Sequence, residues 1–320
     1  MSEVRPAYDA VVVAGPTASG KSAAAMVLAE RFGGVVVNAD SQQLYADLRI
    51  LTARPTAEDE TRVPHRLYGI LPAAEIGSAE RWRRMAVAEI AAARAAGRLP
   101  ILVGGTGLYL RALVQGLATV PDIPEAVRAD ARALRERVGG EEFHRLLAER
   151  DPDAAARLAP GDTQRTLRAF EVVVATGRTL ADWQRDTGPP SDAPHVAAIL
   201  VMPARLDLLP VLNARLRRMV DEGAVDEVRR LLALGLRPDL PAMKAVGVPE
   251  LGRHVRGESD LETATEAATR ATAQYAKRQL TWFRHQAGRD MATHLVVREQ
   301  FSERVLRQIF AFLRRFQLTG

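Results

Sequence analysis

The chain has 320 residues, of which 47% are hydrophobic and 26% are charged, so it is long and apolar enough for more than one average domain. It contains no cysteine, which excludes disulfides, thiolate metal sites and cysteine nucleophiles. No apolar run approaches the roughly 18 residues of a membrane span, and the N-terminal segment lacks the apolar stretch of a signal peptide, so we expect a cytoplasmic protein that binds no membrane.

The formal net charge of +5 is carried largely by arginine, and lysine is scarce. Two origins fit this bias: a genome rich in G and C, or a polyanionic partner whose phosphates suit guanidinium groups. Composition alone leaves both open.

Apolar runs alternate with helical patterns along much of the chain. This alternation predicts an α/β fold with a P-loop-type parallel sheet flanked by helices. Two helices are expected at 22–32 and 79–97, ended by Gly33 and Gly97. The expected strands are "DAVVVAGP" (9–16), "GVVVNAD" (34–40), "LPILVGG" (99–105) and "VAAILVM" (196–202).

The stretch between about 120 and 190 is different, because short helical patterns there are broken by Pro and Gly. Its segment "EVVVATG" fits a strand or a helix. Only helical patterns follow the fourth strand. We therefore expect a catalytic core in two pieces, 1–118 and 194–320, with a helical insertion domain at 119–193.

A phosphate-binding loop lies between the first strand and the first helix. Its pattern is glycine, four residues, then Gly-Lys-Ser, which predicts a polyphosphate site. Backbone N–H groups there face an anion, the lysine adds a charge, and the Ser22 hydroxyl is placed to ligate Mg²⁺. The expected diphosphate-binding residues are Gly15, Pro16, Thr17, Ala18, Ser19, Gly20, Lys21 and Ser22.

The acidic residue of a P-loop NTPase is missing from its usual place. Such enzymes carry it at the end of another apolar strand, yet the strand at 99–105 ends in glycines followed by Thr106. Asp40 instead ends the strand at 34–40, at the sheet edge where ligands bind. A carboxylate there can ligate a metal or remove a proton; the alternative is a turn cap.

Ordered motifs of the sequence resemble the tRNA isopentenyltransferase family, the tRNA dimethylallyltransferases. The resemblance extends from about residue 10 to about residue 285. Its motifs are "GPTASGKS", "NADSQQLY", "PHRLYGI", "GRLPILVGGTGLYLRAL", "QRTLRAFEV" and "AKRQLTWFR".

The resemblance implies transfer of a dimethylallyl group from dimethylallyl diphosphate to the N6 amine of an adenosine. That adenosine lies 3′ of the anticodon in tRNAs that read codons beginning with U, so the implied partner is the anticodon stem-loop of tRNA. Mg²⁺ is the implied cofactor, the loop at 15–22 holds the diphosphate without ATP hydrolysis, and the protein is expected to be a monomer.

The resemblance also assigns roles to residues. Asp40 is implied as the general base, Lys21 and Arg215 act near the diphosphate, and Thr106 lies beside the reaction channel. The implied tRNA-binding residues are Asp40, Ser41, Gln42, Gln43, Thr106, Arg128, Gln164, Arg165, Thr166, Leu167, Arg168 and Lys244.

One segment departs from the family pattern. A Gly-Tyr pair and a basic or polar residue are usual where residues 244–249 are KAVGVP. We expect this to weaken one RNA contact and to leave the chemistry untouched.

Three other functions compete with this one: a P-loop kinase, an enzyme that prenylates free adenine nucleotides, and an RNA-binding protein with a relic loop. The lack of an acid after the strand at 99–105 disfavours the kinase, and the insertion disfavours a small acceptor.

Two aromatic sites are ambiguous. Trp82 is expected to be a half-buried helix residue, and Trp282 and Phe283 belong to the core or, with nearby basic residues, contact RNA.

Overall fold

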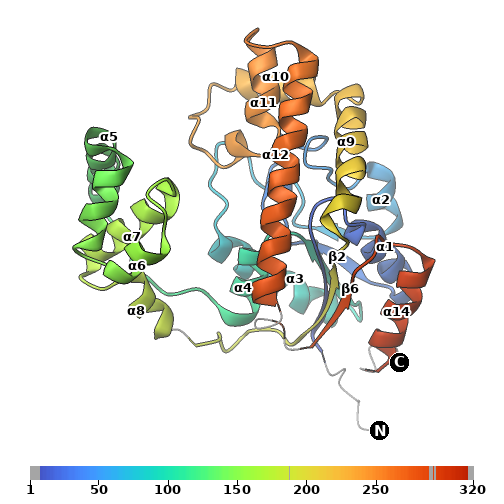
Figure 1. The fold of residues 1–320 in the computed structure, drawn as a ribbon. Coiled ribbons are helices and arrows are strands. Elements are labelled where there is room, and N and C mark those ends of the chain that lie inside the picture. Colours follow the sequence, from blue (N-terminus) through green and yellow to red (C-terminus); the bar gives the residue numbers. More distant parts are fainter. Residues whose placement is uncertain (1–7, 187, 288–290, 292, 316–320) are drawn as a thin grey trace. The chain divides into compact units, whose positions relative to one another are not determined.

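The computed structural model describes residues 8–186, 188–287, 291 and 293–315 (Figure 1). The chain divides into two compact units, of which the first combines Met1–Val114 with Ser191–Gly320 and the second is Gln115–Pro190. Each unit has a hydrophobic cluster of its own.

A parallel sheet forms the centre of the first unit. Its six strands within the described residues follow the order β3-β2-β4-β1-β5-β6, and all the pairings are parallel. The α/β prediction is therefore confirmed, as are the four predicted strands. The strands are β1 Ala10–Ala14, β2 Val35–Asn38, β3 His65–Arg66, β4 Pro100–Gly104, β5 Val196–Val201 and β6 His294–Val297.

The two strands that sequence reasoning missed lie at the sheet edges. β3 has only two residues, which is too short for any pattern, and β6 (HLVV) has a run of only three apolar residues, shorter than the runs of the predicted strands. The prediction that only helices follow the fourth strand was wrong for this reason.

Helices cover both faces of the sheet. Alternate strand residues such as Val11 and Val13 pack in one cluster with α1 (Lys21–Phe32) and α14 (Glu303–Arg314). On α3 (Ala79–Ala95), Trp82 is fully buried, stacks on Tyr109 at 4.6 Å and donates its indole N–H to the Asn38 carbonyl at 2.7 Å. The expectation of a half-buried Trp82 was wrong, because this hydrogen bond lets the indole lie entirely inside.

The C-terminal helices of the first unit pack on one another, and α12 extends alongside α9 and α11 (Figure 1). Within the described residues, none of the helices combines the length and apolar character of a membrane span. The remaining elements of this unit are η1 Gln42–Leu44, α2 Ala57–Arg62, α4 Gly107–Gln115, α9 Arg205–Asp221, α10 Ala224–Ala233, η2 Ala242–Lys244, α11 Val248–Val255, α12 Leu261–Trp282 and the π-helical turn η3 Phe283–Ala287.

The second unit is helical. Its core gathers Phe143, Leu147 and Phe170 with smaller side chains. The ambiguous "EVVVATG" segment is the end of a helix, which Gly177 terminates in a left-handed conformation (φ 68°). The helices are α5 Glu125–Ala148, α6 Pro152–Arg157, α7 Thr163–Thr176 and α8 Leu180–Arg185.

A buried carboxylate holds a loop of the first unit against α10. Glu227 accepts hydrogen bonds from the backbone N–H groups of Arg49 (2.6 Å), Ile50 (2.8 Å) and Leu51 (2.9 Å). Its side chain is buried, so these three donors satisfy a charge that water does not reach. Leu51 is thereby fixed in place.

We predict that Glu227→Gln lowers the free energy of unfolding by about 1–3 kcal/mol, because an amide nitrogen replaces one acceptor oxygen opposite a buried N–H. Urea unfolding followed by circular dichroism measures this change. The matched control is Glu222→Gln, since Glu222 is exposed and forms only a surface ion pair with Arg218 at 3.8 Å. If both variants had the same free energy of unfolding, the hydrogen bonds of Glu227 would not hold the loop against α10.

Candidate active site

The strand order brings three loops together at the carboxyl ends of the strands. The phosphate-binding loop follows β1, Gly105 and Thr106 follow β4, and Asp40 follows β2. Because β4 lies between β1 and β2, the strands that lead to the loop and to Asp40 are two strand spacings apart, roughly 9–10 Å. This is the edge where parallel sheets bind ligands.

The loop at 15–22 has a conformation that few residues can adopt. Ala18 (φ 64°) and Gly20 (φ 88°) are left-handed, which turns the chain sharply before α1 begins at Lys21. At Gly15 there is no space for a side chain, because a Cβ would lie 2.2 Å from the Val201 carbonyl oxygen of β5. The sequence pattern of glycines therefore has a local steric cause.

Polar groups of the loop are directed inward. The Lys21 ammonium donates to the Pro16 carbonyl at 3.2 Å, so the lysine folds back over the loop. Ser19 is fully buried, and its hydroxyl has no hydrogen-bond partner among the described residues. A buried hydroxyl of this kind fits a site that an anion fills.

Two positively charged side chains lie at this site: Lys21 in the loop itself and Arg215 on α9. Burial lowers the pKa of Lys21 to about 8, with Asp40 raising it and Arg215 lowering it. Burial likewise lowers the pKa of Arg215, although Asp40 opposes that shift. Arg215, on α9, donates to the Thr17 hydroxyl at 3.4 Å. A polyphosphate would relieve the repulsion between these two cations.

A cavity of about 580 Å³ opens beside the loop, with Lys21, Ser22, Arg215 and Arg218 in its lining. Sequence reasoning missed Arg218, although it lies one turn after Arg215 on α9. The described residues contain no cluster of three or more acidic or histidine ligands. A divalent ion held at Ser22 would therefore take most of its ligands from phosphate and water, as Mg²⁺ commonly does.

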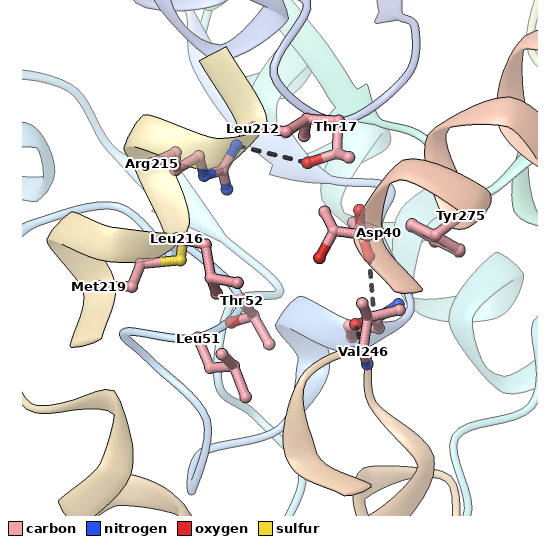
Figure 2. Close-up of a pocket in the computed structure, with 12 residues that line it drawn as sticks. Thr17, Asp40, Leu51, Thr52, Leu212, Arg215, Leu216, Met219, Val246 and Tyr275 are labelled. Carbon is pink, nitrogen blue, oxygen red and sulfur yellow. Dashed lines mark hydrogen bonds between the residues drawn. The ribbon is translucent and has the colours of Figure 1, made fainter. Parts of the chain in front are cut away.

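A second cavity lies next to Asp40 (Figure 2). Figure 2 shows Arg215 directed toward Thr17, while Asp40 occupies the space between α9 and Tyr275 of α12. Apolar side chains form much of the rest of its wall, namely Leu51, Leu212, Leu216, Met219 and Val246.

Asp40 is held by its neighbours in the chain. The Asn38 side chain accepts from the Asp40 N–H at 2.8 Å and donates to the carbonyls of Asp40 and Leu67, both at 3.0 Å. One Asp40 carboxylate oxygen, Oδ1, accepts from the Gln42 N–H at 3.0 Å. The carboxylate therefore caps a turn, as one interpretation expected, and also lines the cavity, while its role as a base stays a prediction.

Tyr275 lines the cavity at Asp40, and Thr106 contacts Ser41, the residue after Asp40. The Thr106 hydroxyl accepts from the Ser41 N–H at 3.0 Å and donates to the Ser41 hydroxyl at 3.2 Å. Burial and the Asp40 charge both raise the pKa of Tyr275, while the nearby polar side chains of Thr106 and Gln42 lower it. Sequence reasoning missed Tyr275, although it directly precedes the family motif "AKRQLTWFR" on α12.

Gln42 and Gln43 hydrogen-bond to the backbone of other loops. Gln43 donates its amide to the carbonyls of Thr52 (2.8 Å) and Ala53 (2.9 Å). Gln42 accepts from the Val246 N–H at 3.1 Å. The segment that departs from the family pattern thus reaches the Asp40 cavity through Val246, which places it closer to the chemistry than we expected. Lys244 is exposed on η2.

The other residues expected to bind tRNA lie in the second unit. Arg128 on α5 and Arg168 on α7 both act on buried Glu171, opposing the increase of its pKa that burial causes. Thr166 is buried and donates its hydroxyl to the Asp162 carbonyl at 2.8 Å, so its side chain serves the helix. Gln164 and Arg165 are exposed, and Leu167 is half-buried.

A parallel sheet with a phosphate-type loop after β1 and an acid after β2 defines an α/β protein of the P-loop type. Residues 43–286 match the family model described as IPP transferase. A tRNA dimethylallyltransferase of Rhodospirillum centenum is 58% identical over 86% of this chain and 88% of its own length. This chain belongs to the IPP transferase family, which confirms the resemblance found in the sequence.

Solved structures of tRNA isopentenyltransferases and dimethylallyltransferases are similar to this chain. The full-length tRNA isopentenylpyrophosphate transferase from Bacillus halodurans is 31% identical, with a TM-score of 0.65 covering 96% of this chain and 97% of that chain. The structure of a eukaryotic dimethylallyltransferase acting on tRNA has the same fold at 23% identity, with a TM-score of 0.78 covering 96% of this chain and 79% of that one.

We predict that pyrophosphate binding weakens as pH rises through about 8, because Lys21 is charged below that value in the free protein and must gain a proton on binding above it. Isothermal titration between pH 6.5 and 9.5 measures the affinity. Pyrophosphate itself titrates in this range, so the Lys21→Arg variant, which stays charged throughout, serves as the reference. Identical pH dependence in both proteins would show that Lys21 does not hold the anion.

Proposed function

We propose that this chain transfers a dimethylallyl group from dimethylallyl diphosphate to the N6 amine of the adenosine 3′ of the anticodon in tRNAs that read codons beginning with U. The products are N6-dimethylallyladenosine in the tRNA and diphosphate. The observation that carries the proposal is the placement of Asp40 one strand beyond β4, facing an apolar cavity that adjoins the phosphate loop.

The donor's diphosphate would lie on the loop between β1 and α1. The backbone N–H groups, Lys21 and Arg215 supply positive charge where the leaving oxygens become more negative. The allylic C1–O bond breaks readily, since the developing cation is delocalised. The apolar wall formed by Leu212, Leu216 and Met219 suits the five-carbon chain and keeps water from that cation.

The acceptor amine needs a base. Its lone pair is delocalised into the adenine ring, so the proton on N6 must leave as the N6–C1 bond forms. Asp40 is the carboxylate in the cavity lining, and Asn38 and Gln42 orient it through hydrogen bonds. We infer that the proton passes from N6 to Asp40 and then to solvent.

Mg²⁺ fits the donor side. Ser22 is exposed at the start of α1 and lines the same cavity as Lys21, and phosphate oxygens would complete the coordination shell. When bound, the ion would neutralise charge on the diphosphate.

The second unit supplies exposed basic and polar groups for RNA, including Arg165 and Gln164. Arginine contacts with phosphates would position the stem, and the adenosine would leave its stack to enter the Asp40 cavity. We also propose that the enzyme is monomeric and works in the cytoplasm.

The kinase alternative has less support. A phosphoryl-transfer site needs an acid close to the transferred phosphate, whereas β4, the strand next to the strand that leads to the loop, ends at Gly104 and is followed by Gly105. Mass spectrometry of nucleosides from unmodified tRNA, incubated with the protein, dimethylallyl diphosphate and Mg²⁺, tests the proposal. A dimethylallyl-modified adenosine supports it, and ATP turnover without tRNA or prenyl donor would favour the kinase.

In this assay we predict that Asp40→Asn loses about 10²–10⁴-fold in turnover, since an amide cannot take the N6 proton. The amide oxygen can still accept from the Gln42 N–H, so the turn and tRNA binding should persist within a few-fold. Single-turnover rates and a tRNA gel-shift assay measure the two effects. Asp207→Asn, an exposed change on α9, is the control. Turnover near the unaltered rate would remove Asp40 from the role of base.

A further inference from the structure

One buried glutamine connects the two sides of the site. Gln279 is 5% exposed and lies on α12. Its Oε1 accepts from the Thr17 N–H at 2.8 Å, and its Nε2 donates to the Gly105 carbonyl at 3.0 Å. The partners fix the orientation of the amide, because a backbone N–H can only donate and a carbonyl can only accept.

The two partners belong to opposite sides of the reaction. Thr17 is part of the phosphate loop, and its hydroxyl accepts from Arg215. Gly105 immediately precedes Thr106, whose hydroxyl contacts Ser41 beside Asp40. Gln279 therefore links the loop after β1 to the turn after β4 through a single rigid amide.

Gln279 packs closely against Gly105. A Cβ at Gly105 would lie 2.1 Å from the Gln279 Nε2 atom, so α12 can approach only a residue without a side chain. On the same helix, Ala276 and Leu280 pack with Leu208 and Leu212 of α9, the helix that carries Arg215. The backbone that presents Gln279 is thus held by a hydrophobic contact.

We propose that Gln279 is a positioning residue, which fixes the phosphate loop against the turn after β4 and thereby sets the distance between the departing diphosphate and the acceptor amine. The inference rests on the proposed function. A misplacement of about 1 Å between reacting groups can cost about 10²-fold in rate, so the link should influence kcat more than the KM of either substrate.

The test exploits the chemistry of the amide. A carboxylate at position 279 cannot donate to Gly105 and would set two acceptors against each other, whereas a protonated carboxyl group has one donor and one acceptor oxygen, as the amide has. Burial raises the pKa of such a carboxyl group. Gln279→Met has a similar volume and offers neither hydrogen bond.

We expect both variants to lose about 10- to 100-fold in kcat at pH 8.5. Relative to the unaltered protein, the kcat of Gln279→Glu should recover as pH falls to 6, and that of Gln279→Met should not. Gln274→Glu, an exposed change on the same helix, should stay within twofold at every pH. Thermal unfolding at each pH ensures that all rates are measured on folded protein.

A kcat of Gln279→Met within twofold of the unaltered protein would overturn the proposal, as would a pH-independent deficit in Gln279→Glu. Hydrogen exchange of the Thr17 amide in the unaltered protein gives a second test that needs no variant, and unprotected exchange would contradict the link. If the unaltered protein forms no prenylated tRNA, the proposed function fails while protection of the Thr17 amide still tests the link.

Discussion

The architecture of the site depends on a strand end without side chains. β4 separates the phosphate loop from Asp40, and packing requires glycine at the end of β4 and at the start of the following helix, α4. A Cβ at Gly104 would lie 2.0 Å from the Ala39 carbonyl oxygen, and one at Gly107 would lie 2.1 Å from the Trp282 ring. The backbones around Asp40 and α12 can therefore lie directly on this strand end. The acid that a nucleotide hydrolase would carry here has no room.

Electrostatics divides the site into two parts. On the loop side, Lys21 and Arg215 repel each other and both have a lowered pKa because they are buried, so an anion stabilises that side. On the other side, Asp40 lies among apolar groups and close to Tyr275, whose pKa is raised in part by the Asp40 charge. In the proposed reaction, a diphosphate on the loop side and a base on the other side would act within one site.

Sequence reasoning found what short patterns encode. The apolar runs identified the buried strands, and the glycine-and-lysine pattern identified the turn between β1 and α1, because both depend on neighbours in the chain. Asp40 was found because parallel strand ends share one edge. The residues that were missed depend on distant packing: Arg218 and Tyr275 lie on helices whose orientation no local pattern fixes, and Gln279 acts through partners 262 and 174 residues away. The burial of Trp82 was also missed, since its partner is a backbone carbonyl on β2.

If the loop holds a leaving group, the bond that breaks joins carbon to oxygen. Dimethylallyl diphosphate with ¹⁸O at the bridging position between C1 and the first phosphorus, incubated with the protein, Mg²⁺ and unmodified tRNA, identifies that bond. We expect all of the label to leave in the released diphosphate while the dimethylallyl group joins the tRNA. Label retained on a free isoprenoid alcohol would show cleavage between phosphorus and oxygen, and would rule out the proposed role of the loop.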